Sequence, residues 1–208
     1  NSAGDSLITK MNNYFYNYKP TLIAIDSEDL QSGKSIASIQ LAIMYNEDTD
    51  FAKYIRWSFE DVAELYKSLY HCVLIEDEAQ NSISRFISNT QAEIIQALLT
   101  TFGDRNHILI TTSGNYQLMS FLKQFVRIRI HFIERGLADI YYPAKNINNS
   151  RILYKRIDTY RFLPVPLDLY EKYYRLKHQY VDKEINRRIN QLKELNGNID
   201  INSLIAVS

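Results

Sequence analysis

Cysteine is nearly absent from this chain: its 208 residues include only Cys72. A single cysteine excludes an intrachain disulfide framework and a zinc site built from clustered cysteines. We interpret Cys72 as an inert side chain of a buried strand. The histidines are few and too scattered for metal-ligand spacing, so we interpret all four as structural: His71, His107, His131 and His178.

Long apolar runs and an excess of charge of one sign are also missing. No run approaches the ~18 residues that a membrane span needs, and the first five residues do not resemble a signal peptide. We therefore expect a cytoplasmic protein. Lys plus Arg and Asp plus Glu number 24 each, so the net charge gives no global indication of a nucleic-acid partner. The length allows one domain with appendages or two small domains.

The sequence does contain a short loop with the chemistry of a phosphate-binding site. An apolar run at Thr21–Ile25 leads to the loop Gln31–Ser35, and Ile36–Ile43 then has the pattern of a helix. Backbone N–H groups at a helix start have no intrahelical partner and can bind phosphate oxygens. Lys34 adds a mobile positive charge, and the Ser35 hydroxyl is placed to bind Mg²⁺.

Three carboxylates stand in or beside this loop: Asp26, Glu28 and Asp29. In the pattern G-x-x-x-x-G-K-[ST], Glu28 occupies the place of the first glycine. Glycine is favoured there because its backbone adopts unusual dihedral angles. Glu28 fits if its own dihedrals are ordinary and its side chain points to solvent. We expect the three negative charges to weaken triphosphate binding.

A second acidic motif follows another apolar segment. Val73–Ile75 leads into Glu76, Asp77 and Glu78, which is typical of a buried parallel strand that ends at a site. Phosphoryl transfer needs a carboxylate at a neighbouring strand end to hold Mg²⁺, and a group that orients the attacking water. Asp77 and Glu78 supply that pair. Glu76 departs from the pattern, because the residue before such a pair is usually apolar.

Polar residues also end the apolar segment Ile108–Ile110. Thr111, Thr112 and Ser113 follow it and are placed to sense a γ-phosphate, although an ordinary strand end explains them equally well.

The overall pattern predicts an α/β fold with a largely parallel core sheet flanked by helices, plus a C-terminal helical extension. We place the core in residues 1–162 and the extension in residues 163–208. Beyond the segments above, the pattern predicts strands at 53–57, 125–132, 140–142 and 152–154. It predicts helices from the N-cap Ser58 through Leu69, over 91–101 with Asn89 or Thr90 as cap and Gly103 as stop, over 116–123, and over 168–195 after a break at 163–166.

Together these segments resemble the additional-strand P-loop ATPases. Ile23–Ser35 is similar to a Walker A strand and loop, and Leu74–Ala79 to Walker B. Arg105–Thr112 is similar to a segment in which an arginine precedes a strand ending Thr-Thr-Gln, with Ser113 in place of the glutamine. The group includes the FtsK–HerA motors, the A32-like viral genome-packaging ATPases and the Zot-like proteins of filamentous phages.

The resemblance implies a hydrolase that uses ATP and Mg²⁺. Ser35 and Asp77 would hold Mg²⁺, Glu78 would orient the attacking water, and Thr112 would sense the γ-phosphate. Lys34 would stabilise the transferring phosphoryl group. The nucleotide cradle would consist of Ser32, Gly33, Lys34, Ser35 and Ile36.

The resemblance also implies a homo-oligomeric ring, in which an arginine of one subunit reaches the neighbour's γ-phosphate. Arg105 is the first candidate, because it matches the arginine before the sensor strand, and Arg85 is the second. Arg127 and Arg129 are the third, and strand alternation sends both to the same face.

The C-terminal part has its own charge character. Residues 151–194 contain 11 basic and 6 acidic residues, a balance of +5 that the rest of the chain offsets. This asymmetry indicates a basic face for DNA. Four tyrosines lie among these charges, and both base stacking and packing against the protein remain open for them: Tyr170, Tyr173, Tyr174 and Tyr180.

Our first hypothesis is an ATPase motor that couples hydrolysis to translocation or packaging of viral or plasmid DNA, in the host cytoplasm if the protein is viral. The second is a Zot-like ATPase of virion assembly or extrusion. The third is a degenerate P-loop module with a structural or binding role, which Glu28 and its neighbouring aspartates favour.

Overall fold

The structure is a computed structural model that describes residues 21–29, 31–78, 89–102, 104–114, 123–145 and 152–197, together with Leu7 and Thr9. The chain divides into two compact units, Asn1–Val165 and Pro166–Ser208. Each unit is described by itself.

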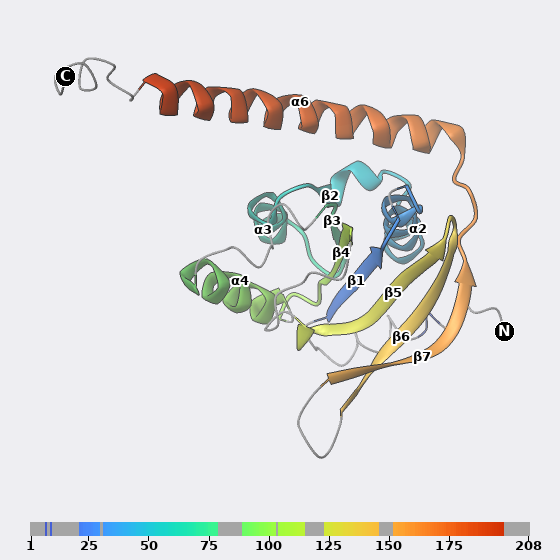
Figure 1. Ribbon diagram of the computed structural model, residues 1–208. Helices are drawn as coiled ribbons and strands as arrows, with labels where there is room; N and C mark the ends of the chain where they lie inside the picture. Colours follow the sequence, from blue (N-terminus) through green and yellow to red (C-terminus); the bar gives the residue numbers. More distant parts are fainter. Residues whose placement is uncertain are drawn as a thin grey trace, which may run out of the picture. The chain divides into compact units, whose positions relative to one another are not determined.

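One mixed sheet forms the centre of the first unit, and within the described residues it has seven strands (Figure 1). The predicted α/β fold with a largely parallel core is confirmed, because the first five strands in spatial order pair in parallel and the last two add antiparallel. The spatial order is β2 (Ile55–Arg56), β3 (Val73–Glu76), β4 (Ile108–Gly114), β1 (Thr21–Ser27), β5 (Val126–Glu134), β6 (Leu137–Lys145) and β7 (Ile152–Arg161).

Helices cover both faces of the parallel part of the sheet (Figure 1). Helix α2 (Lys34–Asn46) packs on one face against β1, β3 and β4. Helices α3 (Phe59–Ser68) and α4 (Asn89–Phe102) pack on the other. On that second face an apolar core joins the sheet to the helices and includes Leu22, Leu74, Leu109, Phe59, Val62, Ile95 and Leu99. Burial on both faces explains the apolar runs Leu22–Ile25, Val73–Ile75 and Ile108–Ile110 in β1, β3 and β4.

Three predicted strands differ from the observed ones: those at 53–57, 140–142 and 152–154. The predicted strand at 53–57 is wrong in part, because a 3₁₀ turn, η1 (Phe51–Lys53), precedes the two-residue strand β2. The Asp48 carboxylate accepts the backbone N–H of Asp50 at 2.8 Å, which favours a turn over an extended chain. The strands predicted at 140–142 and 152–154 are longer than expected, because β6 and β7 pair along their whole lengths.

Other local predictions are confirmed. The Ser58 hydroxyl accepts the backbone N–H of Asp61 at 3.2 Å and caps α3. The predicted break is also confirmed, at residues 162–166. Helix α4 begins earlier than the predicted 91: Asn89 and Thr90, the two predicted caps, are its first helical residues, so neither is its cap. The predicted stop at Gly103 and all of the predicted helix 116–123 except Lys123 lie outside the described residues.

The second unit consists of one long helix in its described part, α6 (Leu167–Gly197), close to the predicted 168–195. None of the described helices combines the length and apolar character required to cross a membrane.

Candidate nucleotide-binding site

The predicted site residues from three segments meet at one edge of the sheet. Strands β1, β3 and β4 run parallel, so their carboxyl ends lie at the same edge. The loop from Glu28 to Gly33 follows β1, Asp77 follows β3, and Thr112 lies near the end of β4, in register with Ile25 of β1. Ligands of parallel α/β sheets bind outside these carboxyl ends.

Gly33 ends the loop in a conformation that favours glycine. Its φ is 103°, in the left-handed region, and it is the N-cap of α2. Its carbonyl accepts the N–H of Ala37 at 2.9 Å, which begins the helix. The preceding carbonyl, of Ser32, accepts the N–H of Gly136 at 3.0 Å, so the turn between β5 and β6 holds the loop in place.

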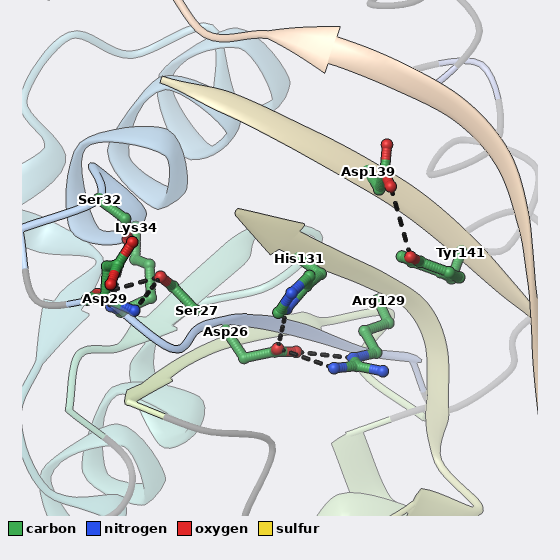
Figure 2. Close-up of polar contacts among 9 residues, drawn as sticks. All are labelled: Asp26, Ser27, Asp29, Ser32, Lys34, Arg129, His131, Asp139 and Tyr141. Atoms are coloured by element: carbon green, nitrogen blue, oxygen red, sulfur yellow. Dashed lines mark hydrogen bonds and ion pairs between the residues drawn. The ribbon is translucent and has the colours of Figure 1, made fainter. Parts of the chain in front are cut away.

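The Lys34 side chain folds back over the loop (Figure 2). Its Nζ donates to the Asp29 carbonyl at 3.1 Å and to Ser32 Oγ at 3.3 Å. Ser27 fixes that carbonyl, because Ser27 Oγ donates to it at 3.0 Å and accepts the N–H of Asp29 at 2.9 Å. The lysine is therefore held beside the loop by neutral acceptors that a phosphate oxygen can replace.

Glu28 meets the two conditions for a residue in place of the first glycine, ordinary backbone dihedrals and a side chain exposed to solvent. Its side chain is exposed, and it is not among the described residues with a left-handed backbone. In this loop Gln31, with φ of 62°, and Gly33 take that conformation instead. The loop therefore does not need a glycine at position 28 in this conformation.

The Asp26 carboxylate is turned away from the loop and neutralised. It is 1% exposed. Arg129 binds it in a bidentate pair, with Nε at 2.7 Å and Nη2 at 2.9 Å, and His131 Nδ1 lies 2.6 Å from Oδ1 (Figure 2). Strands β1 and β5 pair in parallel, with Asp26 opposite His131. Arg129 stands opposite Ala24, two residues before Asp26 on the same face of β1. The expectation that all three loop carboxylates repel a triphosphate therefore needs correction for Asp26.

We expect Arg129→Ala to lower the free energy of unfolding by about 3–5 kcal/mol, because it leaves the buried Asp26 carboxylate without its guanidinium partner. Urea or guanidinium unfolding measures this. Arg127→Ala is the matched control on the same strand and face, with a much smaller expected loss. Replacing both Asp26 and Arg129 with leucine should recover part of the stability. A loss below about 1 kcal/mol for Arg129→Ala would contradict the prediction.

Asp77 is the centre of the predicted metal and catalytic residues. Its carboxylate is fully buried. Oδ1 accepts hydrogen bonds from Ser35 Oγ at 2.7 Å and from Thr112 Oγ1 at 2.6 Å. Thr112 Oγ1 in turn accepts the backbone N–H of Glu78 at 2.9 Å. Tertiary structure thus joins all three motifs through a chain of hydrogen bonds.

Glu78 has a left-handed backbone with φ of 62°. For a residue other than glycine, asparagine or aspartate this conformation is uncommon, and such strain clusters at functional sites. The bond from its N–H to Thr112 holds the residue in this conformation.

The oxygen donors at this point suit Mg²⁺. Ser35 Oγ and the Asp77 carboxylate are hard ligands at adjacent positions, and Mg²⁺ is commonly bound by one or two carboxylates together with substrate phosphates and water. In the part of the chain that the structure describes, no group of three or more His, Cys, Asp or Glu side chains forms a complete metal cage.

The structure places Arg105 away from these residues. It precedes β4, at the edge of the sheet opposite to the loop. Its Nη1 donates to the carbonyls of Tyr66 at 3.0 Å and Lys67 at 2.9 Å, and its guanidinium lies over the Tyr66 and Tyr70 rings. In this subunit it therefore stabilises the end of α3, and its action on a neighbour stays a prediction. The second candidate, Arg85, lies outside the described residues.

Cys72 and His107 lie in contact at that same opposite edge, with Sγ 3.3 Å from Nδ1. Burial raises the pKa of the Cys72 thiol to about 12 and lowers the pKa of His107. Both groups are therefore neutral near pH 7, which agrees with the interpretation of Cys72 as inert rather than nucleophilic.

Sequence reasoning missed one partner of Asp77. Trp57 Nε1 donates to Asp77 Oδ2 at 3.2 Å. The signal available in the sequence was its position at the end of a predicted short strand, the same kind of position as Asp77 itself.

No family model and no curated protein matches the sequence. Among solved structures, the genome packaging NTPase B204 from Sulfolobus turreted icosahedral virus 2 in complex with AMPPCP is 15% identical, covers 72% of this chain and 100% of its own, and gives a TM-score of 0.47. The same NTPase in complex with AMP is 17% identical, covers 67% of this chain and 100% of its own, and gives a TM-score of 0.43. The N-terminal domain of zonular occludens toxin from Neisseria meningitidis is 13% identical, covers 73% of this chain and 97% of its own, and gives a TM-score of 0.41. These likenesses concern the fold alone.

The order of the strands places β4 at the centre of the candidate site. Strand β4 lies between β1, which leads to the Gly33-Lys34-Ser35 loop, and β3, which leads to Asp77 and Glu78. The chain therefore has an α/β fold with a largely parallel core sheet, in which β4 separates the two strands that lead to the candidate site residues.

Proposed function

We propose that this protein is an Mg²⁺-dependent ATPase that couples hydrolysis to the translocation or packaging of DNA. The observation that carries the ATPase part is the chain of hydrogen bonds from Ser35 through Asp77 and Thr112 to Glu78. It joins the start of the loop helix, the metal carboxylate, the sensor strand and the proposed water-orienting residue at one edge of the sheet.

The residues act in the following way. Lys34 exchanges the Asp29 carbonyl and Ser32 Oγ for phosphate oxygens, and the N–H groups in the first turn of α2, which an α-helix leaves without an intrahelical acceptor, bind the phosphates. Ser35 and Asp77 would hold Mg²⁺, which neutralises charge on the β- and γ-phosphates. Glu78 accepts a hydrogen bond from the attacking water and aligns it with the γ-phosphate. Thr112 links the backbone N–H of Glu78 to the Asp77 carboxylate, so the backbone of Glu78 is held beside Asp77.

The DNA part rests on the basic C-terminal region. Helix α6 carries seven Lys and Arg against five Asp and Glu, and β7 carries three against one. Several of these charges are paired. Glu184 binds Arg187 at 2.8 and 2.7 Å and Arg188 at 2.7 Å, and these hydrogen bonds lower the pKa of its carboxyl to about 2. At neutral pH, Glu184 therefore offsets one of the two arginine charges.

This pairing gives the DNA proposal a two-sided test. Replacing Arg187 and Arg188 with alanine should reduce DNA affinity and flatten its salt dependence, because fewer counterions are released. Glu184→Gln should do the opposite and raise affinity, because both arginines lose their carboxylate partner. Filter binding across a salt series measures both, with basal ATPase activity expected to stay unchanged. Equal DNA affinity in all three proteins would contradict a role for this helix face.

Hydrolysis of ATP by the purified protein, measured with and without DNA, tests the function as a whole. Stimulation by DNA supports the motor. Hydrolysis without any response to DNA would favour the alternative, a Zot-like virion assembly ATPase. Absence of nucleotide binding in the presence of Mg²⁺ would favour a degenerate P-loop module. We further propose a homo-oligomeric ring, with Arg105 as the first candidate to act across subunits.

A further inference from the structure

We infer that Trp57 is a positioning residue that orients Asp77 for metal binding, an inference that rests on the proposed nucleotide site. Trp57 directly follows β2, and Asp77 directly follows β3. The two strands pair in parallel with Arg56 opposite Glu76, so the next residue of each strand lies at the same edge. The Asp77 N–H donates to the Arg56 carbonyl at 2.8 Å, which extends this pairing up to the site.

The two oxygens of Asp77 have different partners. Oδ1 accepts hydrogen bonds from Ser35, at the start of α2, and from Thr112, in β4. Oδ2 accepts from the Trp57 indole at 3.2 Å. An indole N–H can only donate, and its ring is rigid. Trp57 therefore fixes the plane of the carboxylate and keeps Oδ1 directed at Ser35, where the metal would bind.

The surroundings make this contact effective. Trp57 is 8% exposed and Asp77 is fully buried, so water competes little for the bond. Hydrogen bonds to ionised acceptors are stronger than neutral ones. The residue after Trp57 is Ser58, the cap of α3, so the backbone of Trp57 leads directly into the start of this helix. Residues that orient a metal ligand commonly change metal affinity by 10–100-fold when they are removed.

Trp57→Phe keeps an aromatic ring but removes the donor. We expect the Mg²⁺ concentration at half-maximal binding of a fluorescent ATP analogue to rise by about tenfold in this variant. Binding of the analogue in EDTA should change little, because the lysine and the loop amides do not depend on Asp77. Phe59→Leu is the matched control: it disturbs a neighbouring buried aromatic with no hydrogen bond to Asp77, and should leave the Mg²⁺ dependence unchanged.

Asp77→Asn and the double variant decide whether Trp57 acts through Asp77. In the Asp77→Asn background, Trp57→Phe should add little to the shift in Mg²⁺ dependence, because contacting residues are non-additive. An additive shift, or an unchanged Mg²⁺ dependence in Trp57→Phe when Asp77→Asn shifts it, would overturn the inference. If neither Asp77→Asn nor Lys34→Ala affects binding, the proposed nucleotide site itself fails.

A measurement on Trp57 itself covers the case in which Trp57→Phe does not fold. Trp57 is the single tryptophan, so the protein gives one indole N–H resonance. We expect this resonance to shift in Asp77→Asn and, in the wild type, when Mg²⁺ is added to the nucleotide-bound protein. A resonance that moves in neither case would contradict the inference.

Discussion

Lys34→Ala should reduce ATP hydrolysis by at least about 10²–10³-fold, the range seen when one preorganised electrostatic contact to a transition state is removed. The variant should remain folded, because Lys34 Nζ donates to Asp29 and Ser32 of its own loop and the residue is not part of the apolar core. Steady-state phosphate release measures activity, and thermal unfolding measures stability.

Lys67→Ala is the matched control for this variant. Its ammonium is exposed and forms an ion pair with Glu64 on α3, away from the loop. Exposed pairs of this kind contribute little, so activity and stability should both stay near wild type. Turnover at the wild-type level in Lys34→Ala would remove the phosphate-binding interpretation of the loop.

Glu78→Gln should separate binding from hydrolysis. The amide keeps the shape of the side chain and the bond from the backbone N–H to Thr112, but it loses the charge that aligns the attacking water. Hydrolysis should fall by about 10²–10⁴-fold, while binding of Mg²⁺ and ATP stays close to wild type. Single-turnover hydrolysis and equilibrium binding of a labelled nucleotide measure the two effects.

Asp77→Asn is the contrasting variant. It removes the carboxylate to which Ser35 and Thr112 donate, so it should weaken Mg²⁺-dependent binding itself. If Glu78→Gln hydrolyses ATP normally, Glu78 is not the water-orienting group. If Asp77→Asn and Glu78→Gln lose binding equally, the separate roles proposed for the two residues are wrong.

The local sequence predicted those features whose causes are local. Strands β1, β3 and β4 each contain a short apolar run that marks them in the sequence. The Ser58 cap depends on the N–H of Asp61, three residues further along the chain. The α/β alternation followed from these elements, because a helix between two buried strands favours parallel pairing.

Long-range pairing decided how these elements act together. The full length of β6 and β7 comes from their pairing with each other, not from their own pattern. The pairing of β1 with β5 places Arg129 and His131 on Asp26, so a carboxylate expected to repel phosphate is neutralised. Arg105 has the sequence position of a catalytic arginine, yet tertiary structure places its guanidinium on the end of α3.

The available chemistry can be read directly from the order of residue types: a glycine and a lysine after β1, two carboxylates after β3, and hydroxyls in β4. The contacts of Asp77 cannot be read in this way, because Ser35, Thr112 and Trp57 reach its carboxylate from three other segments of the folded chain. The physical reason is range. Helix and turn signals act over a few residues, whereas strand order and register depend on how whole faces of the sheet are buried.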